Sequence, residues 1–307
     1  PLHAILLGIG GALVGPEHIP WLAVGGNILL DTASYWVLYR WVSAVSGAPG
    51  LGTLCALLFA LDQRVIEYSS GGKDTALYTF LILASFLAFQ ERRAVWLGLI
   101  AGLAPISRPE GVILGSLLLG FTARRERTLP WRAACMAALV LLPWIAFALW
   151  YYGSVIPQGM ATLWRIAGPP NPGIIFHTAY LHAGQICLAL YGRALWKLWH
   201  YWSWHSMTEA AFQFFLLTLQ LGLCLLAAWR LRLRDGSVLL AAAFCASHVL
   251  AFSLGHPVML GWYEIPLEPF WLCGLVGAWW LLSREWPKPA QTVGVLVLLI
   301  AVEAGAQ

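Results

Sequence analysis

Charged residues are scarce in this sequence. Only 10% of its 307 residues are Asp, Glu, Lys or Arg, whereas 60% are hydrophobic. Soluble globular domains carry about 25% charged residues, so a soluble protein with a surface of ordinary polarity is excluded. The net charge of +4 comes from few basic residues and does not indicate a nucleic-acid partner. The composition predicts a membrane protein that crosses the bilayer several times.

Cysteine and histidine motifs are also missing. The six cysteines occur singly, without CxxC spacing, so we expect packing residues rather than a disulfide framework or a metal site. His248 and His256 have no metal-ligand partners at a useful spacing. The first residues, from Pro1, lack the pattern of a signal peptide. We expect that the start of the gene product lies upstream.

Long apolar runs predict the spanning helices, because a helix needs about 20 apolar residues to cross the hydrocarbon core. Residues 2–15 are too few and predict an interfacial helix. The aromatic stretch RALWKLWHYWSWH, within 157–208, predicts another on the outer leaflet. The predicted spans are 19–39, 49–66, 74–90, 133–151, 209–229, 236–254, 266–283 and 290–306. We therefore predict an all-α polytopic transmembrane bundle that forms a single domain over 1–307.

Residues 94–122 have basic clusters at both ends. Arg92 and Arg93 precede them, and Arg124 and Arg125 follow them. Because basic loops face the cytoplasm, both ends should lie on one side of the membrane. We predict a re-entrant hairpin of two short helices, whose apex PISRPEG lies within the membrane depth towards the outer side. Polar backbone at that depth is tolerated only where it lines a protein-enclosed or wet cavity.

Four motifs occur in order along the chain: SSGGKDTALYTFLIL, GLAPISRPEGVILG, LWYYGSVIPQ and GWYEIPLEP. This series resembles the glycosyltransferase-C class of integral membrane enzymes, especially bacterial members related to polyprenyl-phosphate-dependent arabinosyl- and mannosyltransferases. The resemblance implies a helical bundle in the bacterial inner membrane with an outward-facing active site. It also implies a polyprenyl-phosphate-linked sugar as donor and a glycan, lipid or protein as acceptor. It implies no certain cofactor, and it leaves open whether a divalent metal takes part in the reaction.

The start of the chain departs from that family pattern. Such enzymes usually begin with one span and a long outer loop that carries an acidic catalytic base, whereas this chain starts at PLHAILLG. We expect the span, loop and base to lie upstream of Pro1 and the 307 residues alone to be inactive. If they are active, Asp74 is the first candidate for the base, before Glu67 and Glu264.

Arg108 and Glu110 are the central candidates for binding the substrate. A guanidinium is always charged and offers paired donors to phosphate oxygens, so Arg108 suits the departing carrier phosphate. Glu110 can orient Arg108 or meet a sugar hydroxyl. The alternative is that the two side chains only pair with each other and cap the hairpin. Intramembrane charges favour a functional role.

Other candidates lie in the remaining motifs. Lys73 can attract the carrier phosphate, and Asp74 is either a site residue or the N-cap of the following helix. Tyr152 and Tyr263 either stack on the sugar or anchor at the membrane interface. Glu264, just before a proline, is harder to explain as an anchor.

Two other function classes compete with the transferase. A transporter or lipid flippase also needs polar residues at mid-depth and broken helices. No internal repeat is visible, however, and the polar residues concentrate on one face of the membrane. A non-catalytic membrane scaffold leaves the charges of PISRPEG without a purpose.

Overall fold

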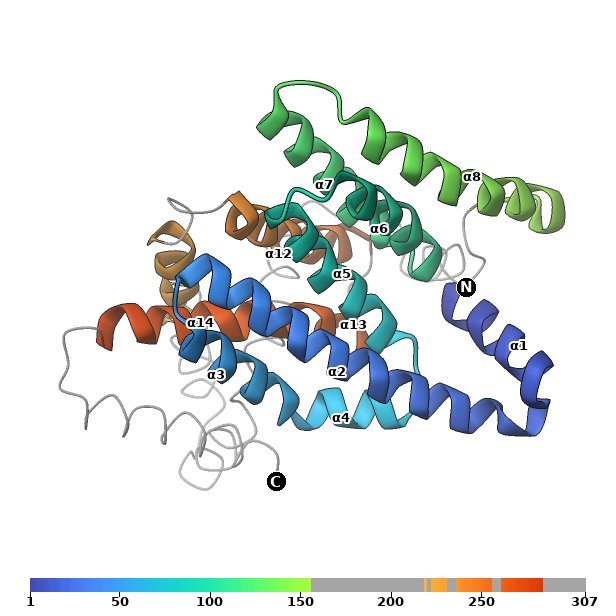
Figure 1. The fold of residues 1–307 in the computed structure, drawn as a ribbon, viewed down its shortest axis with the longest axis horizontal. Coiled ribbons are helices and arrows are strands. Elements are labelled where there is room, and N and C mark those ends of the chain that lie inside the picture. The colour runs from blue at the N-terminus through green and yellow to red at the C-terminus, as the bar shows by residue number, and fades with distance from the viewer. Residues whose placement is uncertain (156–217, 220–221, 231–235, 256–260, 284–307) are drawn as a thin grey trace.

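The computed structural model describes residues 1–155, 218–219, 222–230, 236–255 and 261–283, and these form helices with short connections (Figure 1). No strand occurs in these ranges, which confirms the all-α prediction for them. The helices are α1 (Leu2–Val14), α2 (Ile19–Ser46), α3 (Pro49–Ala60), α4 (Gln63–Ser70), α5 (Thr75–Gln90), α6 (Ala94–Ser107), α7 (Gly111–Glu126), α8 (Trp131–Tyr152), α12 (Gly236–Gly255), α13 (Gly261–Glu264) and α14 (Glu268–Ser283), with 3-10 turns η1 (Pro16–His18) and η2 (Ile265–Leu267).

Some predicted elements lie outside the described residues. These are the aromatic interfacial helix within 157–208 and the span over 290–306. The predicted span over 209–229 is described only in part, and residues 222–229 of it are helical.

Three described helical segments are long and apolar enough to cross a bilayer: Trp131–Tyr152, Gly236–Ser253 and Ile265–Ser283. A fourth counts if the bent pair α3 and α4 forms one broken span. These segments support a membrane-associated protein. Helix α2 covers the predicted span 19–39 and has 28 residues, but it is not in this group. Its polar residues, such as Asn27 and Asp31, lower its hydropathy.

The predicted span over 49–66 corresponds to α3 and α4, and the chain bends by 54° between them. The bend follows from a local cap. The Asp62 carboxylate accepts hydrogen bonds from the backbone N–H groups of Arg64 (2.8 Å) and Val65 (3.4 Å). A new helix therefore begins at Gln63 instead of continuing α3.

Helices α6 and α7 form an antiparallel hairpin, and the short break from Arg108 to Glu110 separates them. A Cβ atom at Gly111 would overlap the carbonyl of Ala104, and one at Gly115 would approach the carbonyl of Ala101 within 2.8 Å. Two glycines four residues apart therefore allow close contact of the two backbones. The predicted pair of helices is present, and its position in a bilayer stays a prediction.

The opposite face of α6 packs against α8 in the same way. A Cβ atom at Gly98 would overlap the backbone of Ala133, and one at Gly102 would lie 2.7 Å from Cβ of Val140. Helix α6 thus lies between α7 and α8 and has small residues on both contact faces (Figure 1).

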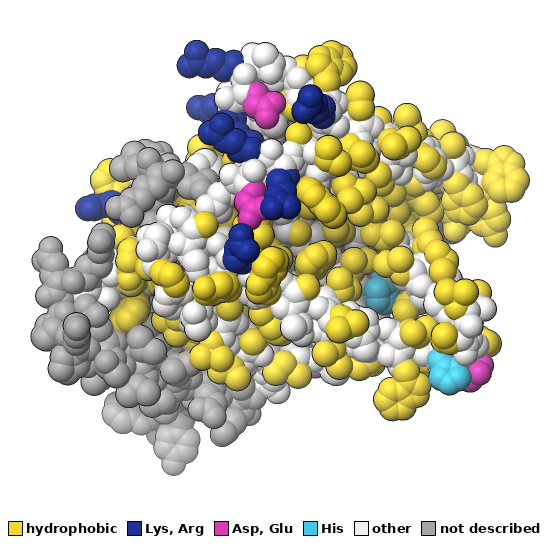
Figure 2. Space-filling model, viewed as in Figure 1, with side chains coloured by type: hydrophobic (Ala, Val, Ile, Leu, Met, Phe, Trp, Pro, Cys, Tyr) yellow, Lys and Arg dark blue, Asp and Glu magenta, His cyan; other side chains and the backbone are white. Residues whose placement is uncertain are grey.

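Basic side chains gather at one end of the helices. Arg40 lies 3.2 Å from Glu91, and Arg93 lies 2.7 Å from the same carboxylate. Arg125, near the end of α7, donates a hydrogen bond to the carbonyl of Phe89. Figure 2 shows Lys and Arg side chains along the upper left of the visible face, while hydrophobic side chains cover most of the rest. We call this end of the bundle the basic end.

We predict that Arg93 and Arg124 react from the same side of the membrane when each is replaced by cysteine. Both side chains are exposed, and the hairpin returns to the end at which it starts. The measurement is labelling with a membrane-impermeant thiol reagent in intact and permeabilised cells. Cys135, an exposed native thiol, is replaced by serine. Lys73→Cys, at the other end of α5, marks the opposite side. Labelling of Arg93→Cys and Arg124→Cys from different sides contradicts the hairpin.

Candidate functional site

Arg108 lies at the break between α6 and α7 and is only 4% exposed. Its Nε atom is 3.2 Å from Oδ2 of Asp74, which precedes α5. Its Nη1 atom is 3.5 Å from Oε1 of Glu110. The structure therefore brings together three predicted site residues, Asp74, Arg108 and Glu110. We call them the Arg108 cluster.

Two tyrosines enclose the guanidinium of Arg108. Its Cζ atom lies 4.9 Å from the ring centroid of Tyr263 and 5.6 Å from that of Tyr78. Both distances are within the range of cation–π contacts. Tyr263 was predicted for the site, whereas sequence analysis missed Tyr78, which is fully buried in α5. The contact ties the segment after residue 260 to the apex of the hairpin.

Of the two roles left open for Asp74, the carboxylate cap of α5 does not form. Asp74 occupies the N-cap position, but its side chain makes no capping hydrogen bond and contacts Arg108 instead. The attraction of a buried guanidinium outweighs a cap, which typically contributes about 1 kcal/mol. The Asp74 side chain is 36% exposed, compared with 8% for Glu110. Asp74 is therefore the accessible carboxylate of the cluster.

A second charged cluster adjoins the first through consecutive residues Tyr263 and Glu264. Nη2 of Arg64 is 2.6 Å from Oε2 of Glu264, and Nη1 of Arg64 is 2.9 Å from Oε1 of Glu268. Burial raises the pKa of Glu264 above its usual range, and the Arg64 guanidinium opposes that shift. We call these three residues the Arg64 clip, because they fasten α4 to the start of α14.

Sequence analysis predicted Glu264 but not Arg64 or Glu268. The available signal was the spacing of Glu264 and Glu268, four residues apart within an apolar stretch. Side chains at that spacing share one face of a helix, and two buried carboxylates require a cation. The sequence alone does not indicate which cation supplies the charge.

Asn27 positions the segment that leads to Asp74. It is fully buried in α2, and its Nδ2 atom donates to the carbonyls of Ser69 (3.1 Å) and Lys73 (2.9 Å). These two carbonyls lie at the ends of the turn that contains Gly71 and Gly72. Gly72 has a φ of 65°, a conformation that glycine adopts without strain. The Asn27 amide thus holds the turn that places Asp74 next to Arg108.

We predict that Asn27→Leu lowers the free energy of unfolding by about 1–3 kcal/mol, because one buried and one partly buried carbonyl lose a donor. Denaturant unfolding in micelles measures the change. Thr32→Val serves as the control, because the Thr32 hydroxyl bonds only within its own helix, at an exposed position. Equal stability of Asn27→Leu and Thr32→Val contradicts the positioning role.

The remaining predicted site residues are Lys73 and Tyr152. Lys73 is exposed, and its Nζ atom lies 4.6 Å from the ring centroid of Tyr68. Tyr152 is half-exposed near the end of α8, where its ring lies 4.7 Å from that of Tyr151. The described contacts of Tyr152 are with aromatic neighbours, as expected for an interface anchor.

The described residues contain no group of three or more His, Cys, Asp or Glu side chains that could hold a metal ion. In the Arg108 cluster, the guanidinium already lies beside both carboxylates. Comparison with protein-family models, curated proteins and solved structures finds no match to the chain.

Proposed function

We propose that this protein is a membrane glycosyltransferase that moves a sugar from a polyprenyl-phosphate carrier to a hydroxyl acceptor. The observation that carries the proposal is the Arg108 cluster: a buried guanidinium at a helix break, with one accessible carboxylate beside it. Such charges are costly among apolar helices and usually serve a function. The proposed site faces the extracytoplasmic side of a bacterial inner membrane, because it lies at the end of α5 away from the basic end.

In the proposed reaction, the bond between the anomeric carbon and the phosphate oxygen breaks, and a bond from the acceptor oxygen to that carbon forms. Arg108 donates hydrogen bonds to the departing phosphate, which leaves as an anion and needs no general acid. The acceptor hydroxyl gives its proton to a carboxylate. Within the described residues Asp74 suits that task best, because it is partly exposed and lies next to Arg108.

Tyr263 supports the same proposal from the other side of the cluster. Its ring faces the guanidinium and is partly buried, so one surface is held by Arg108. A tyrosine in this place can stack on a sugar ring or donate a hydrogen bond from its hydroxyl.

A non-catalytic scaffold is the second candidate, and one observation favours it. Asp74 and Glu110 both lie within ion-pair distance of Arg108, so the three charges also satisfy one another. In that case the cluster only joins the α6–α7 hairpin to the start of α5.

The test is a transfer assay on the protein in bilayer vesicles with a panel of polyprenyl-phosphate sugars. Product with at least one donor, and its loss in Asp74→Asn, would support the transferase with Asp74 as its base. Asp74→Asn keeps the shape of the side chain but removes its charge. Glu91→Gln, at the basic end, is the matched control. If no donor gives product, the scaffold is favoured. Equal rates for wild type and Asp74→Asn exclude Asp74 as the base.

A further inference from the structure

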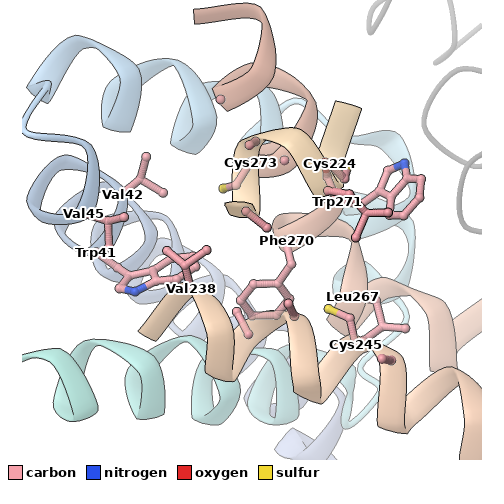
Figure 3. A pocket seen from close by; sticks show the side chains of 18 of the residues that line it. Trp41, Val42, Val45, Cys224, Val238, Cys245, Leu267, Phe270, Trp271 and Cys273 are labelled. Atoms are coloured by element: carbon pink, nitrogen blue, oxygen red, sulfur yellow. Dashed lines mark hydrogen bonds between the residues drawn. The ribbon is translucent and has the colours of Figure 1, made fainter. Parts of the chain in front are cut away.

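A cavity of about 520 Å³ lies between the end of α2, helix 222–230, α12 and α14 (Figure 3). Its volume is within the range of small-molecule sites, about 300–1,000 Å³. Trp41 and Val45 of α2 form one wall, and Cys245 of α12 and Phe270 of α14 form others. None of the residues of the Arg108 cluster lines it. The cavity is therefore a separate feature of the fold.

The wall of the cavity is apolar and offers few polar partners. Ser46 carries the only hydroxyl among the lining side chains, and it donates to the carbonyl of Val42 at 2.7 Å. The indole N–H of Trp41 donates to the hydroxyl of Ser237 at 2.9 Å. Because both groups are already hydrogen-bonded, the cavity suits a ligand that is itself a hydrocarbon.

The cavity opens between helix 222–230 and α12. Leu225 and Leu250 line it and are 66% and 48% exposed, and Ala246 is also exposed at this edge. Residues 236–253 of α12 form a segment that can cross a bilayer. The exposed leucines at the opening therefore face the hydrocarbon region, from which a lipid chain can enter.

Basic residues adjoin two of the lining segments in the sequence. Arg40 directly precedes the lining residue Trp41, and the exposed Arg230 follows the lining residue Ala228 by two positions. Trp41 also bonds Ser237 at the start of α12, so this part of the cavity adjoins the basic end. Basic pockets between spanning helices on this side bind anionic lipid head groups.

We propose that the cavity binds one acyl chain of an anionic phospholipid, whose head group lies near Arg230 at the basic end. The apolar lining suits an acyl chain, and the lateral opening allows that chain to enter. The arginines favour a negatively charged head group. A lipid bound in this way fills the space between α2, α12 and α14 and stabilises their packing. The inference does not rest on the proposed transferase activity.

The test uses phosphatidylglycerol with a photoreactive diazirine at the end of one acyl chain, in phosphatidylcholine vesicles that contain the protein. We expect cross-links to peptides from 222–230 and 236–255. Ala246→Trp blocks the opening and should reduce the yield to background. Ala138→Trp, at an exposed position of α8, is the matched control and should leave it unchanged.

The head group is tested separately. Arg230→Gln should lower the yield about fivefold, as expected for one basic residue near an anionic head group. Arg132→Gln, at an exposed position in the first turn of α8, should not. A phosphatidylcholine probe that labels equally well overturns the anionic assignment.

Three further results overturn the proposal. If no cross-links form to the lining peptides, the cavity does not hold the lipid chain and is filled by the protein's own side chains. An unchanged yield in Ala246→Trp means that the chain binds elsewhere. Stronger competition by a polyprenyl phosphate than by unlabelled phosphatidylglycerol assigns the cavity to a different lipid. Arg108→Lys should leave the labelling unchanged, so failure of the transferase proposal is distinguishable from failure of this one.

Discussion

Replacing Arg64 by alanine is expected to lower the free energy of unfolding by about 3–5 kcal/mol. Arg64 lies between Glu264 and Glu268, at 2.6 and 2.9 Å, and the Glu268 side chain is fully buried. Without the guanidinium, two neighbouring carboxylates remain out of water and repel each other. Such a loss is a large part of the stability of a typical domain. Denaturant unfolding in mixed micelles measures it.

The control is Arg40→Ala, because the Arg40 side chain is 48% exposed in its pair with Glu91. An exposed ion pair contributes about 0–1 kcal/mol. In the double variant Arg64→Met, Glu268→Gln, a buried carboxylate is removed along with the cation. That variant should be more stable than Arg64→Met alone. If Arg64→Ala is no less stable than Arg40→Ala, the Arg64 clip does not hold α4 to α14.

Arg108→Lys is expected to reduce the transfer rate roughly 10²-fold, if the proposed activity is correct. The guanidinium reaches Asp74 through Nε and Glu110 through Nη1, and it faces the ring of Tyr263. An ammonium group is a point charge and cannot reproduce this planar geometry towards a phosphate. The measurement is the initial rate with a polyprenyl-phosphate sugar at equal amounts of folded protein.

Arg40→Lys is the matched control, because it makes the same exchange at the basic end. Glu110→Gln should have a milder effect if Glu110 only orients Arg108. Arg108→Ala separates the two candidate functions. Wild-type rates in both Arg108→Lys and Arg108→Ala mean that the cluster is structural and that its charged side chains only form ion pairs with one another.

Features set by neighbouring residues could be predicted from the sequence. The break at PISRPEG is one example, because Pro109 and Gly111 disfavour a continuous helix. Helix α6 ends at Ser107, and α7 begins at Gly111. The glycine pairs in GLIAG and GVILG are a further local signal, typical of close helix contacts. They correspond to the two faces of α6 and α7 that pack tightly.

Features that depend on distant residues could not be predicted. Asp74 fits the local rule for an N-cap, but its carboxylate instead accepts a hydrogen bond from Arg108, which is 34 residues away in the sequence. Tyr78 looks like an ordinary residue of an apolar helix until the hairpin places Arg108 beside it. In each case the tertiary contact decides among several local possibilities.

The Arg64 clip has a consequence for how the protein is made. Arg64 and Glu264 are 200 residues apart in the chain. At synthesis rates of about 5–20 residues per second, Arg64 exists for about 10–40 s before its partners have been made. During that time α4 carries a cation without its final counter-charges, and water or lipid phosphate must solvate it. The first helices can therefore enter the membrane early, but the contact between α4 and α14 closes only after Glu264 and Glu268 have been made.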